Sequence, residues 1–247
     1  TKFFRPYCLV YLDQQLLQAK SKSCYSINKE ANQYLKQCGF EFLSTSAEFC
    51  EPFPDTYIIK LKRFKGNISV IESDIINWIQ DDIICLFPAI PSSLKKAIGE
   101  NLFEIINNSI FHGANENGIS IAGQFYPQKS YCEIAFYDAG VGIPKLVREF
   151  DSNFLECTDC QCIEWAIQNY NSTRNLDDPG GIGLNAVRTF LQKNNGTFQM
   201  VSGNGYYAEN IDGITHASHT LLNNIDGTLV NLRIVIDLET YSLQRAI

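Results

Sequence analysis

The stretch GENLFEIINNSIFHG, residues 99–113, is the segment from which the fold of the chain is best predicted. Its apolar residues recur at helical spacing, and they predict one long helix that begins at a capping Ser92 or Ser93 and runs to about His112. The same stretch carries two carboxylates, three asparagines and one histidine. A polar group that is buried without a partner destabilises a fold, so this helix needs a core on one side and polar partners on another.

Two stripes of this helix have different chemistry. The core-facing stripe comprises Ile98, Leu102, Ile105, Ile106 and Ser109. Glu104 and Asn108, four residues apart, project together from an adjacent stripe, which Asn101 and His112 extend by a turn at each end. The amide oxygen of Asn is a hard ligand for Mg²⁺, and the carboxylate of Glu accepts a proton from water. Many helices carry such a pair, so by itself it also fits an ordinary solvated face.

The segments after the helix predict a largely antiparallel sheet. Strands are expected at residues 118–126, 131–139, 196–203, 206–210 and 227–237, and helices at 143–150, 160–170 and 184–195. Long helices on one face of such a sheet predict an α+β fold, a two-layer α/β sandwich.

The first ninety residues predict a small mixed α/β region of unknown role. Strands are expected at 3–12 and 56–64, and helices at 27–38 and 71–86. Pro88 and Pro91 punctuate the chain after them. We therefore expect two domains, residues 1–90 and residues 91–247.

Composition narrows the function. The net charge of −7 argues against a general nucleic-acid binder, and no apolar run approaches the roughly eighteen residues of a membrane span. Nine scattered cysteines fit a reducing, cytoplasmic location better than a disulfide framework. CTDCQC, residues 157–162, has spacing with which a zinc site could begin, but no matching pair of ligands follows nearby. The basic run at residues 60–65 fits a solvated strand face.

A second candidate motif is AFYDAGVGIP, residues 135–144. A strand ends at Asp138, and Gly140 and Gly142 then let the backbone turn sharply and approach a flat ligand closely. A carboxylate at the base of such a pocket suits the exocyclic amine of adenine. The alternative is a strand-ending turn in which Asp138 bonds its own backbone.

A third motif is DPGGIGLNAVRTF, residues 178–190. Gly180, Gly181 and Gly183 immediately precede a helix, where free backbone N–H groups and the helix dipole favour a phosphate. The alternative is a flexible loop whose glycines only permit a tight entry into the helix.

Taken in order, ExxxN, DxGxGI and GGxGL resemble the GHKL superfamily. This is the ATP-binding domain shared by gyrase, the MutL mismatch-repair proteins, the large heat-shock chaperones and sensor histidine kinases. The resemblance covers residues 91–237, including the late strand GTLVNLRI, and the chain resembles the stand-alone GHKL proteins of bacteria. It implies the Bergerat ATP-binding fold, with ATP and Mg²⁺ as cofactors.

The resemblance also implies roles for individual residues. Glu104 takes the place of the general base, and Asn108 that of the Mg²⁺ ligand. Asp138 takes the place of the adenine-binding acid, and Thr228 that of a threonine bridged to it through water. The other residues placed around the nucleotide are Gly140, Gly142, Ile143, Gly181, Gly183 and Leu184.

The segment between Pro144 and Pro179 is then the ATP lid. Arg174 in this lid is expected to reach the phosphates, because its planar fork of donors matches phosphate oxygens, although an arginine on a surface loop is common. His112 lies where histidine kinases often carry an aromatic residue or a histidine at the phosphate edge. Phe111 stands where many of them carry a lysine, which argues against a kinase.

Three functions share this pocket. The leading hypothesis is a lid-gated ATPase that acts as a switch on a protein partner, which is expected to be separately encoded. The alternative is a protein kinase of the anti-sigma-factor or histidine-kinase type, and the third is a nucleotide sensor without catalysis. The histidines of the printed sequence lie at 112, 216 and 219, so no phosphoacceptor helix is expected before the ATP domain, and the few residues after the last strand leave no room for a transducer. No nucleic acid and no membrane is expected as partner; a homodimer is left open.

Overall fold

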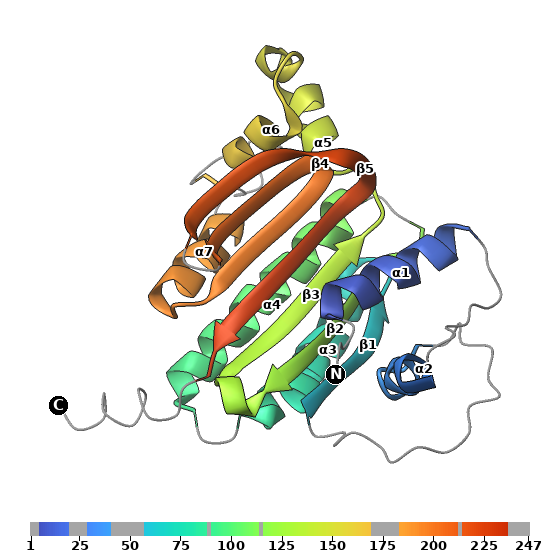
Figure 1. Ribbon diagram of the computed structural model, residues 1–247, viewed down its shortest axis with the longest axis vertical. Helices are drawn as coiled ribbons and strands as arrows, with labels where there is room; N and C mark the ends of the chain where they lie inside the picture. The colour runs from blue at the N-terminus through green and yellow to red at the C-terminus, as the bar shows by residue number, and fades with distance from the viewer. Residues whose placement is uncertain are drawn as a thin grey trace.

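The computed structural model describes residues 5–19, 29–40, 57–87, 90–113, 116–168, 183–211 and 214–236. These residues form an α+β protein in which helices pack against a five-stranded antiparallel sheet (Figure 1). The strands are β1 (Ile58–Phe64), β2 (Ile119–Tyr126), β3 (Tyr131–Asp138), β4 (Thr197–Ile211) and β5 (Ile214–Val235). Their order across the sheet is β1-β2-β3-β5-β4. The predicted fold class, an antiparallel sheet with helices packed on it, is confirmed at this level.

The helices lie on both faces of the sheet. They are α1 (Pro6–Gln18), α2 (Lys29–Gln37), α3 (Ile68–Trp78), α4 (Ser92–Gly113), α5 (Ile143–Phe150), α6 (Asp159–Ala166) and α7 (Gly183–Lys193). Figure 1 shows α4 behind the sheet and α1 across the opposite face, over β2 and β3. The expected layer of long helices is therefore present, and α1 covers part of the second face.

The strand predicted at residues 3–12 is wrong, because residues from Pro6 onward form the helix α1. A proline at the first helical position lacks only an N–H that would have no helical partner, so it starts a helix readily. The buried residues Leu9, Val10, Asp13 and Gln14 lie on one side of this helix. Its run of apolar and aromatic residues has the composition of a strand, but its burial follows a helical period.

Other elements follow the sequence more closely. Helix α5 has the predicted bounds, and α4 extends the predicted helix by one residue. The helix expected at 71–86 is present as α3, a π-helical turn at Ile79–Ile83 and a 3₁₀ turn at Ile84–Leu86. The strands expected at 196–203 and 206–210 are one element, β4, whose register shifts between Ser202 and Gly205.

Two hydrophobic cores lie on the two faces, as the alternation along β3 shows. Ile134 and Phe136 face the larger core, which includes the predicted buried stripe of α4. Ala135 and Tyr137 face the smaller core beneath α1. Successive residues of one strand therefore face two different helices.

A buried ion pair fixes α1 to the sheet. The Asp13 carboxylate is fully buried, and it accepts hydrogen bonds from Arg63 at 2.6 Å and 2.8 Å and from the Ser120 hydroxyl at 2.6 Å. Gln14 donates to the same hydroxyl at 2.9 Å. Arg63 thus departs from the solvated face expected for the basic run, since its guanidinium turns toward α1.

Residues on both sides of position 90 contribute to one sheet and one core. Strand β1 pairs with β2 along the sheet edge, and Ile59 and Phe64 of β1 lie in the same core as Leu102 of α4. The division into domains at residue 90 stays a prediction from the sequence.

Candidate adenine-nucleotide site

The candidate site lies where β3 ends beside the interior of β5. Asp138, the last residue of β3, is the register partner of Thr228 on β5. Asp138 is 5% exposed, and its Oδ1 accepts a hydrogen bond from the Gly140 N–H at 3.2 Å. The hydroxyl of Ser109, from α4, also hydrogen-bonds this carboxylate. Two residues that are distant in the sequence, Asp138 and Thr228, are thus neighbours at one edge.

Burial changes the acidity of Asp138. Removal from water raises the pKa of its carboxyl from 3.8 to about 7, and the hydrogen bonds from Gly140 and Ser109 offset only part of that rise. Both of these partners are neutral. A carboxylate that is buried without a cation is costly unless a donor reaches it, which is the environment expected at a ligand site.

Two backbone turns meet beside Asp138: the turn at Ala139–Gly142 that follows it, and a tight turn at Asp226–Gly227, which is a bulge within β5 where the pairing with β4 shifts. Both turns require glycine. Gly142 has φ of +80°, and a Cβ there would lie 3.1 Å from the Gly227 carbonyl oxygen. Gly227 has φ of +76°, and a Cβ there would lie 2.0 Å from the Asp138 carbonyl oxygen and 2.5 Å from the Gly140 nitrogen. No side chain fits in so small a space. The sequence motif at Gly140 and Gly142 is therefore packed directly on the turn that precedes Thr228.

Ser202 of β4 joins the two turns, and the sequence reasoning missed it. Its fully buried hydroxyl donates to the Gly227 carbonyl at 2.8 Å and accepts from the Ile143 N–H at 2.9 Å. It lies 3.0 Å from the Thr228 hydroxyl. No local signal marks Ser202, since its position follows from the register in which it opposes Thr228.

The polar stripe of α4 is present as expected. Glu104 and Asn108 are both half-buried, and the Asn108 amide nitrogen donates to the Glu104 carboxylate at 2.9 Å. This hydrogen bond uses the amide nitrogen of Asn108, so its amide oxygen is the atom that could bind Mg²⁺. Ser109, the next residue, reaches Asp138. The Glu104–Asn108 stripe and Asp138 are therefore connected through one turn of α4.

The predicted phosphate motif is only partly described. Gly183 begins α7, and the half-buried Leu184 packs against the larger core beside α4. The start of α7 thus lies beside the helix that carries Glu104 and Asn108. Gly181, Arg174 and the side chain of His112 lie outside the part of the chain that the structure describes.

The described part of the predicted lid consists of α5, a 3₁₀ turn and α6. The Arg148 guanidinium bridges the Asp159 carboxylate at 2.7 Å, and the second oxygen of Asp159 accepts from the Asn204 N–H at 2.8 Å. Thr158 and Gln161 cap α6 reciprocally. The described part of the predicted lid is therefore attached to β4 at Asn204, where the register of that strand shifts.

The cysteine cluster is divided by burial. Cys160 and Cys162 are buried, and Cys157 is half-buried. Within the described ranges, no group of three or more His, Cys, Asp or Glu side chains has an arrangement that could hold a metal ion.

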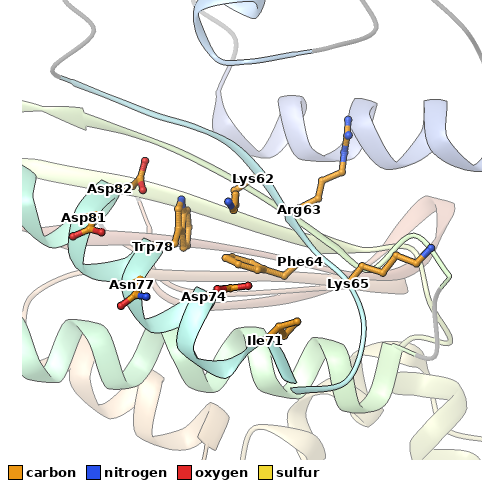
Figure 2. Close-up of a pocket in the computed structure, with 10 residues that line it drawn as sticks. All are labelled: Lys62, Arg63, Phe64, Lys65, Ile71, Asp74, Asn77, Trp78, Asp81 and Asp82. Atoms are coloured by element: carbon orange, nitrogen blue, oxygen red, sulfur yellow. The ribbon is translucent and has the colours of Figure 1, made fainter. Parts of the chain in front are cut away.

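A separate groove of about 540 Å³ lies between β1 and α3 (Figure 2). Lys62 and Lys65 line one side, and Asp74, Asp81 and Asp82 line the other. Neither Asp138 nor the polar stripe of α4 is among the residues that line this groove. Because its two sides carry opposite charges, the groove favours neither an anionic nor a cationic ligand. We do not include it in the candidate site.

Comparison with known proteins leaves the chain without an assigned family. No known protein family matches it, and no curated protein matches it significantly. Within the described ranges, none of the helices combines the length and the hydrophobicity that crossing a bilayer requires.

Proposed function

We propose that this chain is an ATP-binding protein of the GHKL type, with a Bergerat fold, that hydrolyses Mg-ATP as a lid-gated switch on a protein partner. The observation that carries the proposal is the burial of Asp138 between two glycine turns, where the described donors to its carboxylate, the Gly140 N–H and the Ser109 hydroxyl of α4, are neutral. An adenine amine supplies the further donor that this carboxylate lacks.

The residues of α4 support the hydrolytic part of the proposal. Glu104 accepts a proton from the attacking water, and Asn108 orients its carboxylate through the 2.9 Å hydrogen bond. A Mg²⁺ ion held by the Asn108 oxygen and the phosphates would neutralise negative charge on the nucleotide. In phosphoryl transfer, positioning and charge stabilisation supply most of the catalysis, so a fixed pair of side chains on one helix suits this reaction.

Calorimetric titration of the full chain tests this function. With Mg²⁺ present, ATP is expected to give a saturable binding heat. Inosine triphosphate, which carries a carbonyl in place of the adenine amine, is expected to bind more weakly by at least about tenfold, because two acceptors would face each other. Absence of any heat with ATP would overturn the proposal. Equal affinity for both nucleotides would show that Asp138 does not recognise the adenine amine.

Affinity for ATP is expected to fall at mildly acidic pH. With a pKa of about 7, the ionised fraction of Asp138 decreases from roughly nine-tenths at pH 8 to one-tenth at pH 6. An amine donor favours the ionised form, so the dissociation constant should rise about tenfold over this interval. The folding stability of the nucleotide-free protein should depend on pH in the opposite direction. Because burial raises the pKa of Asp138, its contribution to stability is present below about pH 4 and is lost as the pH rises through 7.

The control for this pH dependence is Asp138→Asn, measured at the same two pH values. The nucleotide titrates identically with both proteins, so only the wild type should show the additional tenfold change. An equal pH dependence in the two proteins would contradict the role of Asp138.

A further inference from the structure

Helix α1 lies on the face of the sheet opposite α4, yet it bonds the turn after Asp138 directly and reaches the Asp226–Gly227 turn through Tyr137. Asp138 points toward α4, and its neighbour Tyr137 points toward α1, because successive residues of a strand face opposite sides. Any displacement at the end of β3 therefore reaches α1 through Tyr137. Tyr137 is fully buried, and its ring lies 5.4 Å from that of Tyr11 on α1.

The Tyr137 hydroxyl holds the turn before Thr228. It donates to the Asp226 carbonyl at 2.7 Å, and it accepts from the Gln15 amide of α1 at 3.5 Å. The next residue in that turn is Gly227, whose carbonyl accepts from Ser202. The Asp226–Gly227 turn is thus held from the α1 side by Tyr137 and from the β4 side by Ser202.

The turn after Asp138 is held by the same helix. The Gln18 amide at the end of α1 donates to the Ala139 carbonyl at 3.3 Å, and the Gln15 amide donates to the Gln18 side-chain oxygen at 3.3 Å. Ala139 lies between Asp138 and Gly140, so Gln18 acts on the segment that would contact the purine. Gln15 links the two hydrogen bonds into one network.

We propose that Tyr137 and Gln18, held by α1, are positioning residues for the adenine end of the nucleotide site. This inference depends on the proposed nucleotide binding. The two turns flank Asp138, and hydrogen bonds from the α1 side of the sheet hold them in addition to those of Ser202. By linkage, nucleotide binding stabilises the docked α1 by the same factor by which docked α1 strengthens nucleotide binding.

The variants Gln18→Ala and Tyr137→Phe test the inference in the full chain. Each removes neutral hydrogen bonds to a turn without removing a site residue, so the dissociation constants for ATP and ADP should rise about threefold to tenfold. The loss should be equal for both nucleotides, because it arises at the adenine end. The turnover number at saturating ATP should be unchanged, since Glu104 and Asn108 are intact. Gln128→Ala, in the exposed turn at the opposite end of β3, is the matched control and should bind as the wild type does.

Hydrogen exchange provides a readout that a purely structural role would not move. In the wild type, saturating ATP should slow exchange of the α1 amides, and Tyr137→Phe should reduce this effect. If the wild type binds ATP while both variants bind equally well, the positioning role is overturned. A variant that lowers only the melting temperature, with unchanged affinity, also overturns it. If the wild type itself binds no ATP, the proposed function fails first, and the inference fails with it.

Discussion

Replacing Glu104 by glutamine is expected to lower the rate of ATP hydrolysis by about two to four orders of magnitude. The glutamine side chain keeps the length of the original, and its oxygen can still accept the hydrogen bond from Asn108 that the structure places at 2.9 Å. An amide cannot take a proton from water, so only the proton transfer is lost. The affinity for Mg-ATP should change little, because Glu104 contributes no contact to the adenine end.

Phosphate release and calorimetric affinity are measured together on this variant. Glu100→Gln is the matched control, because it lies one turn earlier on α4 and is exposed, and its carboxylate pairs with Lys96 at 3.6 Å on the solvent side. It should hydrolyse ATP as the wild type does. If the Glu104 variant hydrolyses ATP at the rate of the wild type, Glu104 is not the general base.

Labelled γ-phosphate distinguishes the three functional classes. Release of free phosphate by the wild type supports the ATPase, whereas transfer of label to a partner protein would support the kinase alternative. A Glu104→Gln variant that binds ATP and keeps its full effect on the partner would indicate a nucleotide sensor. Phe111 is 55% exposed near the end of α4, and its side chain offers no charge to a phosphate.

Elements whose stability depends on near neighbours could be predicted from the sequence. The bounds of α5 and the buried face of α4 follow from Pro144 near a helix start and from apolar residues at helical spacing. Strands β2 and β3 follow from alternation and from the short connection at Pro127–Lys129.

Features that depend on long-range pairing could not be predicted. Ser202 reaches the site only because β4 and β5 pair in the register that places it opposite Thr228. Gly227 is required because its Cβ position is occupied by the turn after Asp138, a contact that no local pattern encodes. Helix α1 was predicted as a strand because its composition suits either structure, and its burial against β2 and β3 decides between them.

The surroundings of Asp138 combine locally predictable features with features that depend on long-range pairing. The motif predicted that a carboxylate would end a strand before a glycine turn, and the alternative was that this carboxylate only bonds its own backbone. The structure shows that such a bond exists, to the Gly140 N–H, and that it occupies Oδ1. The two interpretations are therefore compatible, because the two oxygens of a carboxylate offer about four acceptor positions, and Gly140 and Ser109 do not use all of them.

Replacing Asp138 by asparagine is expected to weaken ATP binding by about a hundredfold. Asparagine has a single side-chain oxygen, and Gly140 requires an acceptor at the Oδ1 position. If the oxygen stays there, the new NH₂ group faces the adenine amine; if the amide flips, the NH₂ group faces the Gly140 N–H. Either orientation leaves buried donors without acceptors, which costs about 1–3 kcal/mol. At 3 kcal/mol this is more than a hundredfold in affinity.

Two further measurements on the Asp138→Asn variant distinguish a loss of purine recognition from a loss of folding stability. At pH 8 the asparagine variant should resist unfolding at least as well as the wild type, because burial of the ionised carboxylate opposes folding at that pH. Its discrimination between purines should also narrow or reverse, since an NH₂ group can donate to the carbonyl of inosine triphosphate. Asp82→Asn, on an exposed residue of the separate groove, should leave both affinities unchanged. Unchanged ATP affinity in the Asp138 variant, with the protein folded, would show that this carboxylate does not contact the purine.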